Sequence, residues 1–386
     1  MTGWNRTPGW NRTLLAWICL ASAPLPVMAQ DYDIGDIPIG QTIALSGGTA
    51  EHGRAVNTGA RAYFEAINAR GGIRGRRILL KFVDDGGTAT RAAENTARLI
   101  KDDRVLAIFG GIEGGPCVAS MQVATDSRVP FVACLAGSPE MREPFNRYAF
   151  PVRAPHLAEF EQLIDHARLF KWTRIGFLHA DTDTGRKHLA NVERILDRHG
   201  LKLAVAIPIP NSTPNPVTIA EAIVGAKVDA MFNHGSYGLY GNVIQQVRKR
   251  QGEGRGTSFL AVNSGAEQLS RILGTERHGL IFTQVVPYPW QGSLDVVKEH
   301  RELLRALDPN AIPTFSSLEG HISAKVLVEG LRGMTGRITR DELVRSLERL
   351  GNIDVGGLSV RYGPNSREGS TYVDMVMAVS RGGFSR

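Results

Sequence analysis

Two short segments rich in glycine and other small residues are the parts of this sequence that most directly indicate chemistry. Residues 110–117 read GGIEGGPC, and residues 134–140 read CLAGSPE. Each follows a short apolar stretch, so each is expected to turn a strand into a helix with backbone N–H groups that no side chain shields. Such N–H groups attract anions. The carboxylate site predicted from them comprises Gly114, Gly115, Ala136, Gly137 and Ser138.

These glycines could instead serve only to permit tight turns, and one such segment alone would favour that alternative. Two segments, each at the end of a strand, favour a ligand site, because open α/β sheets bind ligands beyond the carboxyl ends of their strands. The first segment lacks the Gly-Lys-Ser/Thr ending of a phosphate-binding loop and the spacing of a dinucleotide site. Nucleotide binding is therefore not expected.

Three later segments that follow apolar stretches carry hydrogen-bonding side chains, which suits contact with the rest of a ligand. They are 179–185 (HADTDTG), 233–237 (NHGSY) and 263–265 (NSG). The ligand-binding residues predicted there are Asp181, Thr184, Tyr237 and Asn263.

Simpler roles are open to some of these polar residues. Asp181 and Asp183 could cap the start of a helix. His179 and His234 could be ordinary histidines at the ends of strands. The sequence shows no set of four ligands at metal-binding spacing, so no metal ion is expected.

Catalytic motifs and nucleic-acid signals are not evident. The chain lacks the Gly-x-Ser-x-Gly and His-Glu-x-x-His patterns and has no cysteine with a recognisable base. We expect neither an enzyme nor a cofactor. The formal net charge of +7 is spread in clusters such as 74–77 and 248–250, without interleaved aromatic residues. Solvated helix ends and loops explain such clusters better than a nucleic-acid groove.

The elements that must position these residues follow from hydrophobic patterning. Short apolar stretches alternate with longer amphipathic ones, which is typical of parallel sheets covered by helices. The first series predicts strands at 39–45, 78–83, 105–109 and 129–134 and helices at 53–68, 89–100 and 118–127. The second predicts strands at 174–179, 203–208, 228–233, 259–262 and 280–286 and helices at 184–198, 219–224 and 240–250. The fold class is α/β, with two doubly wound parallel sheets.

The last third of the chain breaks this alternation. Helices are predicted at 294–307, 318–332 and 341–350, followed by a hairpin of strands 358–362 and 372–379 around 363–366. The expected lobes are 36–150 with 287–350, and 151–286 with 351–386. The chain would thus cross between the two lobes three times, near 150, 287 and 350. These three crossings would form a hinge that allows closure around a ligand.

The first 29 residues are predicted to be a cleaved signal peptide, so the mature chain is expected to be exported. Arg6 and Arg12 precede the apolar run Leu14–Leu20, and small residues precede Gln30. A membrane anchor would need a longer apolar run, and the residues before Cys19 do not suit a lipoprotein.

Two cysteines would remain after cleavage, Cys117 and Cys134. An oxidising compartment permits a disulfide between them, but the sequence does not supply the Cα separation that decides it.

Several motifs resemble the leucine/isoleucine/valine-type periplasmic solute-binding proteins. They are Gly40-x-x-x-x-Leu45-Ser46-Gly47, the run 68–75 (NARGGIRG), the turn 129–140, the helix start 317–326 and the run 356–358. The resemblance covers nearly the whole mature chain. It implies a type I binding fold, a monomer, and delivery of a small amino acid or other carboxylate to the permease of an ABC importer in the inner membrane.

The resemblance also implies residue roles. Gly115, Ala136 and Ser138 would hold the ligand carboxylate, and Tyr237 and the turn 181–184 would contribute from the second lobe. A sensor that presents the same ligand to a membrane receptor or kinase would share these residues, and an exported hydrolase has less support.

Two departures from the family pattern bear on the ligand. Asn263 is neutral where amino-acid binders carry an acid that pairs with the ammonium, and Thr184 replaces an aromatic residue. A buried ammonium without a partner would be costly. The replacement charge could come from Asp181, Asp183, Glu113 or Glu319; otherwise the ligand is an acid without an amine.

Overall fold

Two mainly parallel β-sheets organise the chain from Asp31 onward. The computed structural model describes residues 1–3, 32, 35–210, 214–252, 256–262, 265–380 and 382–386. The signal peptide predicted at 1–29 and the predicted site residue Asn263 lie outside the described residues, apart from residues 1–3. Within the described part of the chain, no helix combines the length and the apolar character needed to cross a membrane.

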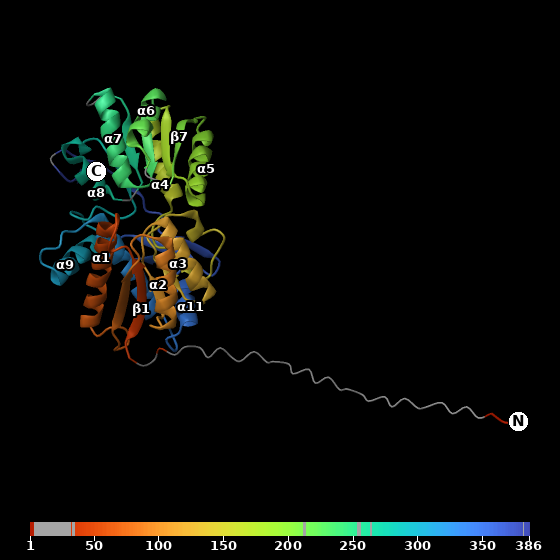
Figure 1. Ribbon diagram of the computed structural model, residues 1–386. Coiled ribbons are helices and arrows are strands. Elements are labelled where there is room, and N and C mark those ends of the chain that lie inside the picture. The colour runs from red at the N-terminus through yellow and green to blue at the C-terminus, as the bar shows by residue number, and fades with distance from the viewer. Residues whose placement is uncertain (4–31, 33–34, 211–213, 253–255, 263–264, 381) are drawn as a thin grey trace. The chain divides into compact units, whose positions relative to one another are not determined.

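The first sheet has five parallel strands in the order β2-β1-β3-β4-β5. Figure 1 labels its strand β1 together with the helices α1, α2 and α3 of the same part of the chain. Its strands are β1 (Ile37–Ile43), β2 (Ile78–Asp84), β3 (Ala107–Phe109), β4 (Phe131–Val132) and β5 (Ala149–Phe150). The helices that alternate with them are α1 (Ala50–Ala69), α2 (Ala89–Lys101) and α3 (Gly114–Asp126), and the short 3₁₀ helix η1 (Pro139–Met141) follows β4. The alternation predicted for this part of the chain is confirmed.

Both faces of this sheet are buried. Successive side chains of a strand point to opposite faces, so neighbouring residues belong to different apolar clusters. Phe109 belongs to the large apolar cluster that includes Phe64 of α1. Its neighbour Ile108 belongs to a second cluster with Leu99 of α2 and Met121 of α3. This explains why the strands read as continuous apolar runs.

The second sheet has seven strands in the order β15-β14-β10-β9-β8-β6-β7, and only β14 and β15 run antiparallel to their neighbours. Its strands are β6 (Ile175–Ala180), β7 (Leu203–Ile209), β8 (Ala230–His234), β9 (Ser258–Ala261), β10 (Ile281–Gln284), β14 (Asp374–Ala378) and β15 (Phe384–Ser385). The accompanying helices are α4 (His156–Leu169), α5 (Asp183–Arg198), α6 (Pro216–Gly225), α7 (Tyr237–Gln251), α8 (Ala266–Leu273) and the 3₁₀ helix η2 (Gly274–Arg277). The sequence did not predict α4 or α8.

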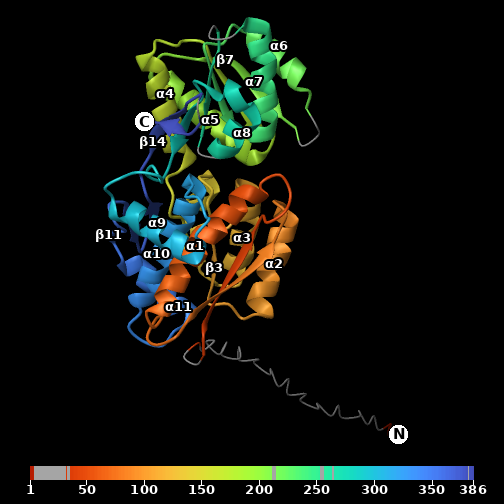
Figure 2. The ribbon, with the colours of Figure 1, turned by 90° about the vertical axis from the view of Figure 1, so that its left-hand side faces the viewer.

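Three helices and a small sheet complete the part built on the first sheet. They are α9 (Asp295–Leu307), α10 (Phe315–Arg332), α11 (Arg340–Arg349), β11 (Asn352–Asp354), β12 (Ser359–Gly363) and β13 (Ser366–Gly369). Helix α10 lies directly beside α1 (Figure 2). A Cβ atom added to Gly59 would lie 1.8 Å from the carbonyl oxygen of Ser317, so only glycine allows this approach of the two backbones.

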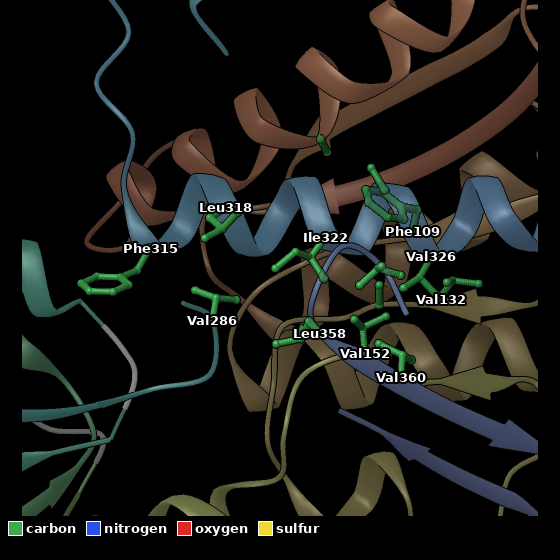
Figure 3. Packing of buried hydrophobic residues seen from close by; sticks show 14 of the residues in the cluster. Phe109, Val132, Val152, Val286, Phe315, Leu318, Ile322, Val326, Leu358 and Val360 are labelled. Atoms are coloured by element: carbon green, nitrogen blue, oxygen red, sulfur yellow. The ribbon is translucent and has the colours of Figure 1, made fainter. Parts of the chain in front are cut away.

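One face of α10 forms the centre of the large apolar cluster. Phe315, Leu318, Ile322 and Val326 recur at the three- and four-residue spacing of a single helix face. Figure 3 shows them meeting residues from distant parts of the chain: Phe109, Val132, Val152, Val286, Leu358 and Val360.

The hairpin predicted for the C-terminal part is wrong. Strand β12 pairs with β13 through a two-residue turn at Pro364 and Asn365, whereas β14 pairs with β10 and β15. The Tyr362 hydroxyl donates to the carbonyl oxygen of Pro151, 2.9 Å away, which holds the small sheet beside β5. The turn was predicted correctly, but the strand that pairs across it is β13, immediately after the turn, and not the predicted 372–379.

This correction moves the third crossing between sheets. The chain enters the seven-stranded sheet between β13 and β14, after Gly369, whereas the sequence placed this crossing near 350. We propose that 351–369 belongs to the first lobe and 374–386 to the second. Below, the first lobe denotes the five-stranded sheet with α1–α3 and α9–α11, and the second lobe denotes the seven-stranded sheet with α4–α8.

Candidate ligand-binding site

The first predicted turn leaves helix α3 open at its amino end. Gly110, Gly111 and Glu113 have φ angles of 67°, 95° and 67°, which direct the chain sharply from β3 into the helix. The cap residue Glu113 makes no side-chain hydrogen bond to the helix start. The N–H groups of Gly114 and Gly115 have no partner within the helix, as for any first turn, and can receive a ligand.

The second predicted turn brings a hydroxyl group to the same place. Ser138 is 1% exposed, and its Oγ lies 2.7 Å from where a Cβ on Gly114 would stand. Gly137 packs against the second lobe, because a Cβ there would lie 2.6 Å from the backbone nitrogen of His156. Ala136 is buried within the cluster beneath α3. The two turns therefore converge as predicted from their places at strand ends.

A disulfide joins these turns. Cys117 of α3 and Cys134 after β4 are bonded, with Cα atoms 6.0 Å apart. The pairing that the sequence left open is thus present. It fixes the amino end of α3 relative to the loop that carries Ser138.

Thr184 of the second lobe reaches the same point. Its Cγ2 lies 3.9 Å from the position of a Cβ on Gly114, and its Oγ1 donates to Glu140 Oε1 at 3.2 Å. Lys187 Nζ also binds Glu140 Oε1, at 2.7 Å. Gly114, Ser138 and Thr184 therefore surround one point, and they come from three separate segments of the chain.

Tyr237, at the start of α7 in the second lobe, makes another contact with the first lobe besides that of Thr184. Its hydroxyl donates to the carbonyl oxygen of Gly48 at 2.6 Å. Its ring covers Gly265, where a Cβ would lie 2.4 Å from Cδ1 and where φ is +69°. Only glycine suits this position, both for its backbone conformation and for the aromatic ring above it.

Asp181 and Asp183 are paired elsewhere. Arg186 Nη1 lies 2.8 Å from Asp181 Oδ1, and Arg186 Nη2 lies 2.5 Å from Asp183 Oδ1, with all three side chains exposed. Neither carboxylate caps α5, because Thr182 does so by accepting from the N–H of Gly185 at 3.1 Å. The helix-capping alternative for these aspartates is therefore wrong.

Glu113 is the carboxylate that sequence reasoning left out of the main site. Its Oε2 lies 3.2 Å from the position of a Cβ on Gly87, and Thr49 donates a hydrogen bond to it. Burial raises the pKa of Glu113 to about 7, and the nearby Asp85 adds to the shift. Burial also raises the pKa of Tyr237, and the charge of the nearby Glu113 adds to the shift. No sequence motif marks this glutamate.

Glu319, another predicted source of negative charge, faces a cation already. Its Oε1 lies 3.7 Å from Arg153 Nε, and both side chains are buried. Among the four carboxylates considered for an ammonium, three are therefore adjacent to arginine, and Glu113 is adjacent to a hydroxyl group.

A hollow of about 790 Å³ lies elsewhere on the second lobe. Its lining includes Arg248, Ser258 and Glu276. Ser258 begins β9, so this hollow lies at the amino end of a strand, opposite to the edge at which such sheets bind ligands.

Comparison with known proteins identifies the family of this chain. The model of a family described as periplasmic binding protein matches residues 36–383. A solved structure of a possible leucine/isoleucine/valine-binding protein from Rhodopirellula baltica SH 1 has a TM-score of 0.83 and 26% identity, covering 92% of this chain and 97% of that one.

Two curated relatives are also similar. The Leu/Ile/Val/Thr-binding protein of Salmonella typhimurium is 24% identical over 283 residues, which is 72% of this chain and 74% of that protein. The Leu/Ile/Val-binding protein homolog 7 of Brucella abortus is 25% identical over 206 residues, so the match spans about half the length of each, 51%. This chain therefore belongs to the periplasmic binding protein family and is of the leucine/isoleucine/valine type.

Proposed function

We propose that this protein is the substrate-binding component of an ABC importer and captures a small amino acid between its two lobes. The observation that carries the proposal is the meeting of Gly114, Ser138 and Thr184. The free N–H groups at the start of α3 and the Ser138 hydroxyl would hold the ligand carboxylate. Thr184 would complete the enclosure from the second lobe.

Glu113 supports an amine on the ligand. It directly precedes the carboxylate seat formed by Gly114 and Ser138, and it neighbours Thr49 and Tyr237. An ammonium group would stabilise its carboxylate form, whose pKa burial has raised. This would substitute for the acid that the family carries at the position of Asn263.

The setting of the family supports transport from the periplasm. Its members are periplasmic proteins that bind small ligands, and the signal peptide predicted at 1–29 would export this chain to that compartment. The disulfide suits an oxidising environment. The name of the Salmonella relative, a Leu/Ile/Val/Thr-binding protein, supports an amino acid with a small side chain.

Replacing Gly114 by alanine should weaken amino-acid binding roughly 10- to 100-fold. The new methyl group would lie 2.7 Å from Ser138 Oγ, so the hydroxyl must turn away or the methyl must occupy the seat. Losing one hydrogen bond to a charged group typically costs about 1.5–3 kcal/mol. Isothermal titration of protein stripped of copurified ligand, across a panel of aliphatic amino acids, measures the change.

The matched control is Gly225→Ala at the end of α6, where a Cβ meets no atom within 4 Å. It should bind as the wild type does. Equal affinity in Gly114→Ala and Gly225→Ala would place the ligand elsewhere and refute the proposed seat.

Replacing Glu113 by glutamine should lower the affinity for amino acids roughly 30-fold or more, because a buried ammonium would lose its charged partner. Binding of the corresponding 2-oxo acids, which lack the amine, should change little. If the variant retains full amino-acid affinity, Glu113 does not hold the ammonium, even where Gly114→Ala still shows the carboxylate seat to be right.

The pH dependence gives an independent check of the same residue. Glu113 in the free protein has a pKa raised to about 7 by burial, so it gains a proton as the pH falls below that value. Affinity for an amino acid should therefore be level near pH 8, where the ligand ammonium is still charged, and fall about tenfold per pH unit below pH 6. Glu113→Gln should show no such fall in this range.

A further inference from the structure

Three histidines from separate segments of the second lobe lie together near the candidate site. His156 begins α4, His188 lies on α5, and His234 ends β8. One ring nitrogen from each lies within 4.8 Å of the other two. The ring centroids are 5.2 Å apart for His156 and His188, 4.5 Å for His156 and His234, and 4.2 Å for His188 and His234.

These rings are buried without the hydrogen bonds that buried imidazoles usually make. His188 is 0% exposed and His156 is 6% exposed. Both ring nitrogens of His188, and Nδ1 of His156 and of His234, are buried and lack a hydrogen-bond partner. Buried polar nitrogens normally have partners, so this group of nitrogens points to an additional atom that they hold in common.

Imidazole is a common metal ligand in proteins, and each of the three rings offers one nitrogen to the group.

The surrounding charges include carboxylates that would offset a cation. Glu159 Oε1 lies 3.5 Å from His156 Nδ1 and so offers negative charge beside the group. Glu140 and Glu159 both favour positive charge at His188. Arg153 and Arg142 act in the opposite direction at His156, and Arg153 is itself adjacent to Glu159 and Glu319.

We propose that His156, His188 and His234 bind one divalent transition-metal ion, for which Zn²⁺ is the model. A tetrahedral ion with Zn–N bonds of about 2.0–2.1 Å needs ligand nitrogens roughly 3.3 Å apart. The present nitrogens lie within 4.8 Å of one another, so the rings must rotate about their side-chain bonds to reach that spacing. A water molecule would take the fourth position.

The position of this site connects it to ligand binding. The N–H of His156 donates to the carbonyl oxygen of Gly137 at 2.9 Å, immediately before Ser138. A metal ion held by His156 would therefore hold the start of the second lobe against the loop that carries the carboxylate seat. The inference does not depend on which ligand the protein transports.

The test uses the mature chain without a polyhistidine tag, stripped with a chelator. Co²⁺ should bind at one ion per chain and give the visible absorption of a tetrahedral site, and Zn²⁺ should displace it. Zn²⁺ in excess should raise the melting temperature by several degrees, because it binds the folded state. Wild-type protein that shows neither the Co²⁺ spectrum nor a Zn²⁺-dependent shift overturns the proposal.

Variants separate this site from other histidines. His188→Gln should weaken Co²⁺ binding about 100-fold or more, since loss of an outer-shell partner alone costs 10- to 100-fold. The matched control is His300→Gln, another fully buried histidine, which lies in the first lobe beside Ser317. It should bind Co²⁺ normally. If His188→Gln does not fold, His188→Leu replaces it, because His188 has no hydrogen bond to lose. Undiminished Co²⁺ binding in the folded variant assigns the metal to other residues and refutes the site.

Discussion

Replacing Arg153 by alanine is expected to reduce the free energy of unfolding by about 3–5 kcal/mol. The guanidinium forms an ion pair with Glu159 and lies 3.7 Å from Glu319, and the three side chains are no more than 5% exposed. Thr283 donates to the second oxygen of Glu159 at 3.1 Å. Without the cation, two buried carboxylates would keep their desolvation penalty and lose the charge that compensates it.

This cluster also joins the lobes. Arg153 lies at the first crossing, Glu159 is on α4 of the second lobe, and Glu319 is on α10 of the first lobe. Its loss should therefore affect the transition of the whole molecule in urea. The control is Arg168→Ala, whose exposed pair with Asp165 should contribute about 1 kcal/mol or less. A loss for Arg153→Ala as small as that of the control would contradict this account.

Replacing both Cys117 and Cys134 by serine should cost about 3 kcal/mol of stability, the value expected for a loop of about this length. The two residues are 17 positions apart, so the bond removes conformational freedom from the unfolded chain. Urea denaturation of the variant and of the wild type measures the difference.

Ligand binding gives a second measurement on the same variant. Because the bond fixes the start of α3 against the loop that carries Ser138, amino-acid affinity should also fall. A reducing agent should destabilise the wild type and leave the double-serine variant unchanged. A variant as stable as the oxidised wild type would show that the disulfide adds nothing to the fold.

Much of the fold and part of the candidate site could be predicted from the sequence alone. Strand and helix periodicities are local, so the alternation that builds both sheets could be read directly. The turns holding Gly114 and Ser138 followed from it, because parallel neighbouring strands end at one edge of a sheet. The family motifs, which depend on the same local constraints, indicated the leucine/isoleucine/valine type, and the comparisons confirm this.

Which distant segments and side chains pair with one another was decided only by the tertiary structure. The turn after Tyr362 was evident, but pairing of β14 with β10 depends on which sheet edge is exposed to it. The Cys117–Cys134 bond depends on a Cα separation that no spacing in the sequence supplies. Asp181 was a predicted site residue and Glu113 only an alternative source of charge, but the fold places Arg186 beside the first and Thr49 beside the second.

The histidine cluster shows this limit most clearly. His156, His188 and His234 stand in three different elements and follow no metal-binding spacing, so the sequence predicted no metal ion. Packing of α4 and α5 on the second sheet brings their rings together. Sequence patterns record the period of each element, whereas contacts between side chains of different elements arise only when those elements pack. The element types were therefore determined by the sequence, and the chemistry shared between elements was determined by the fold.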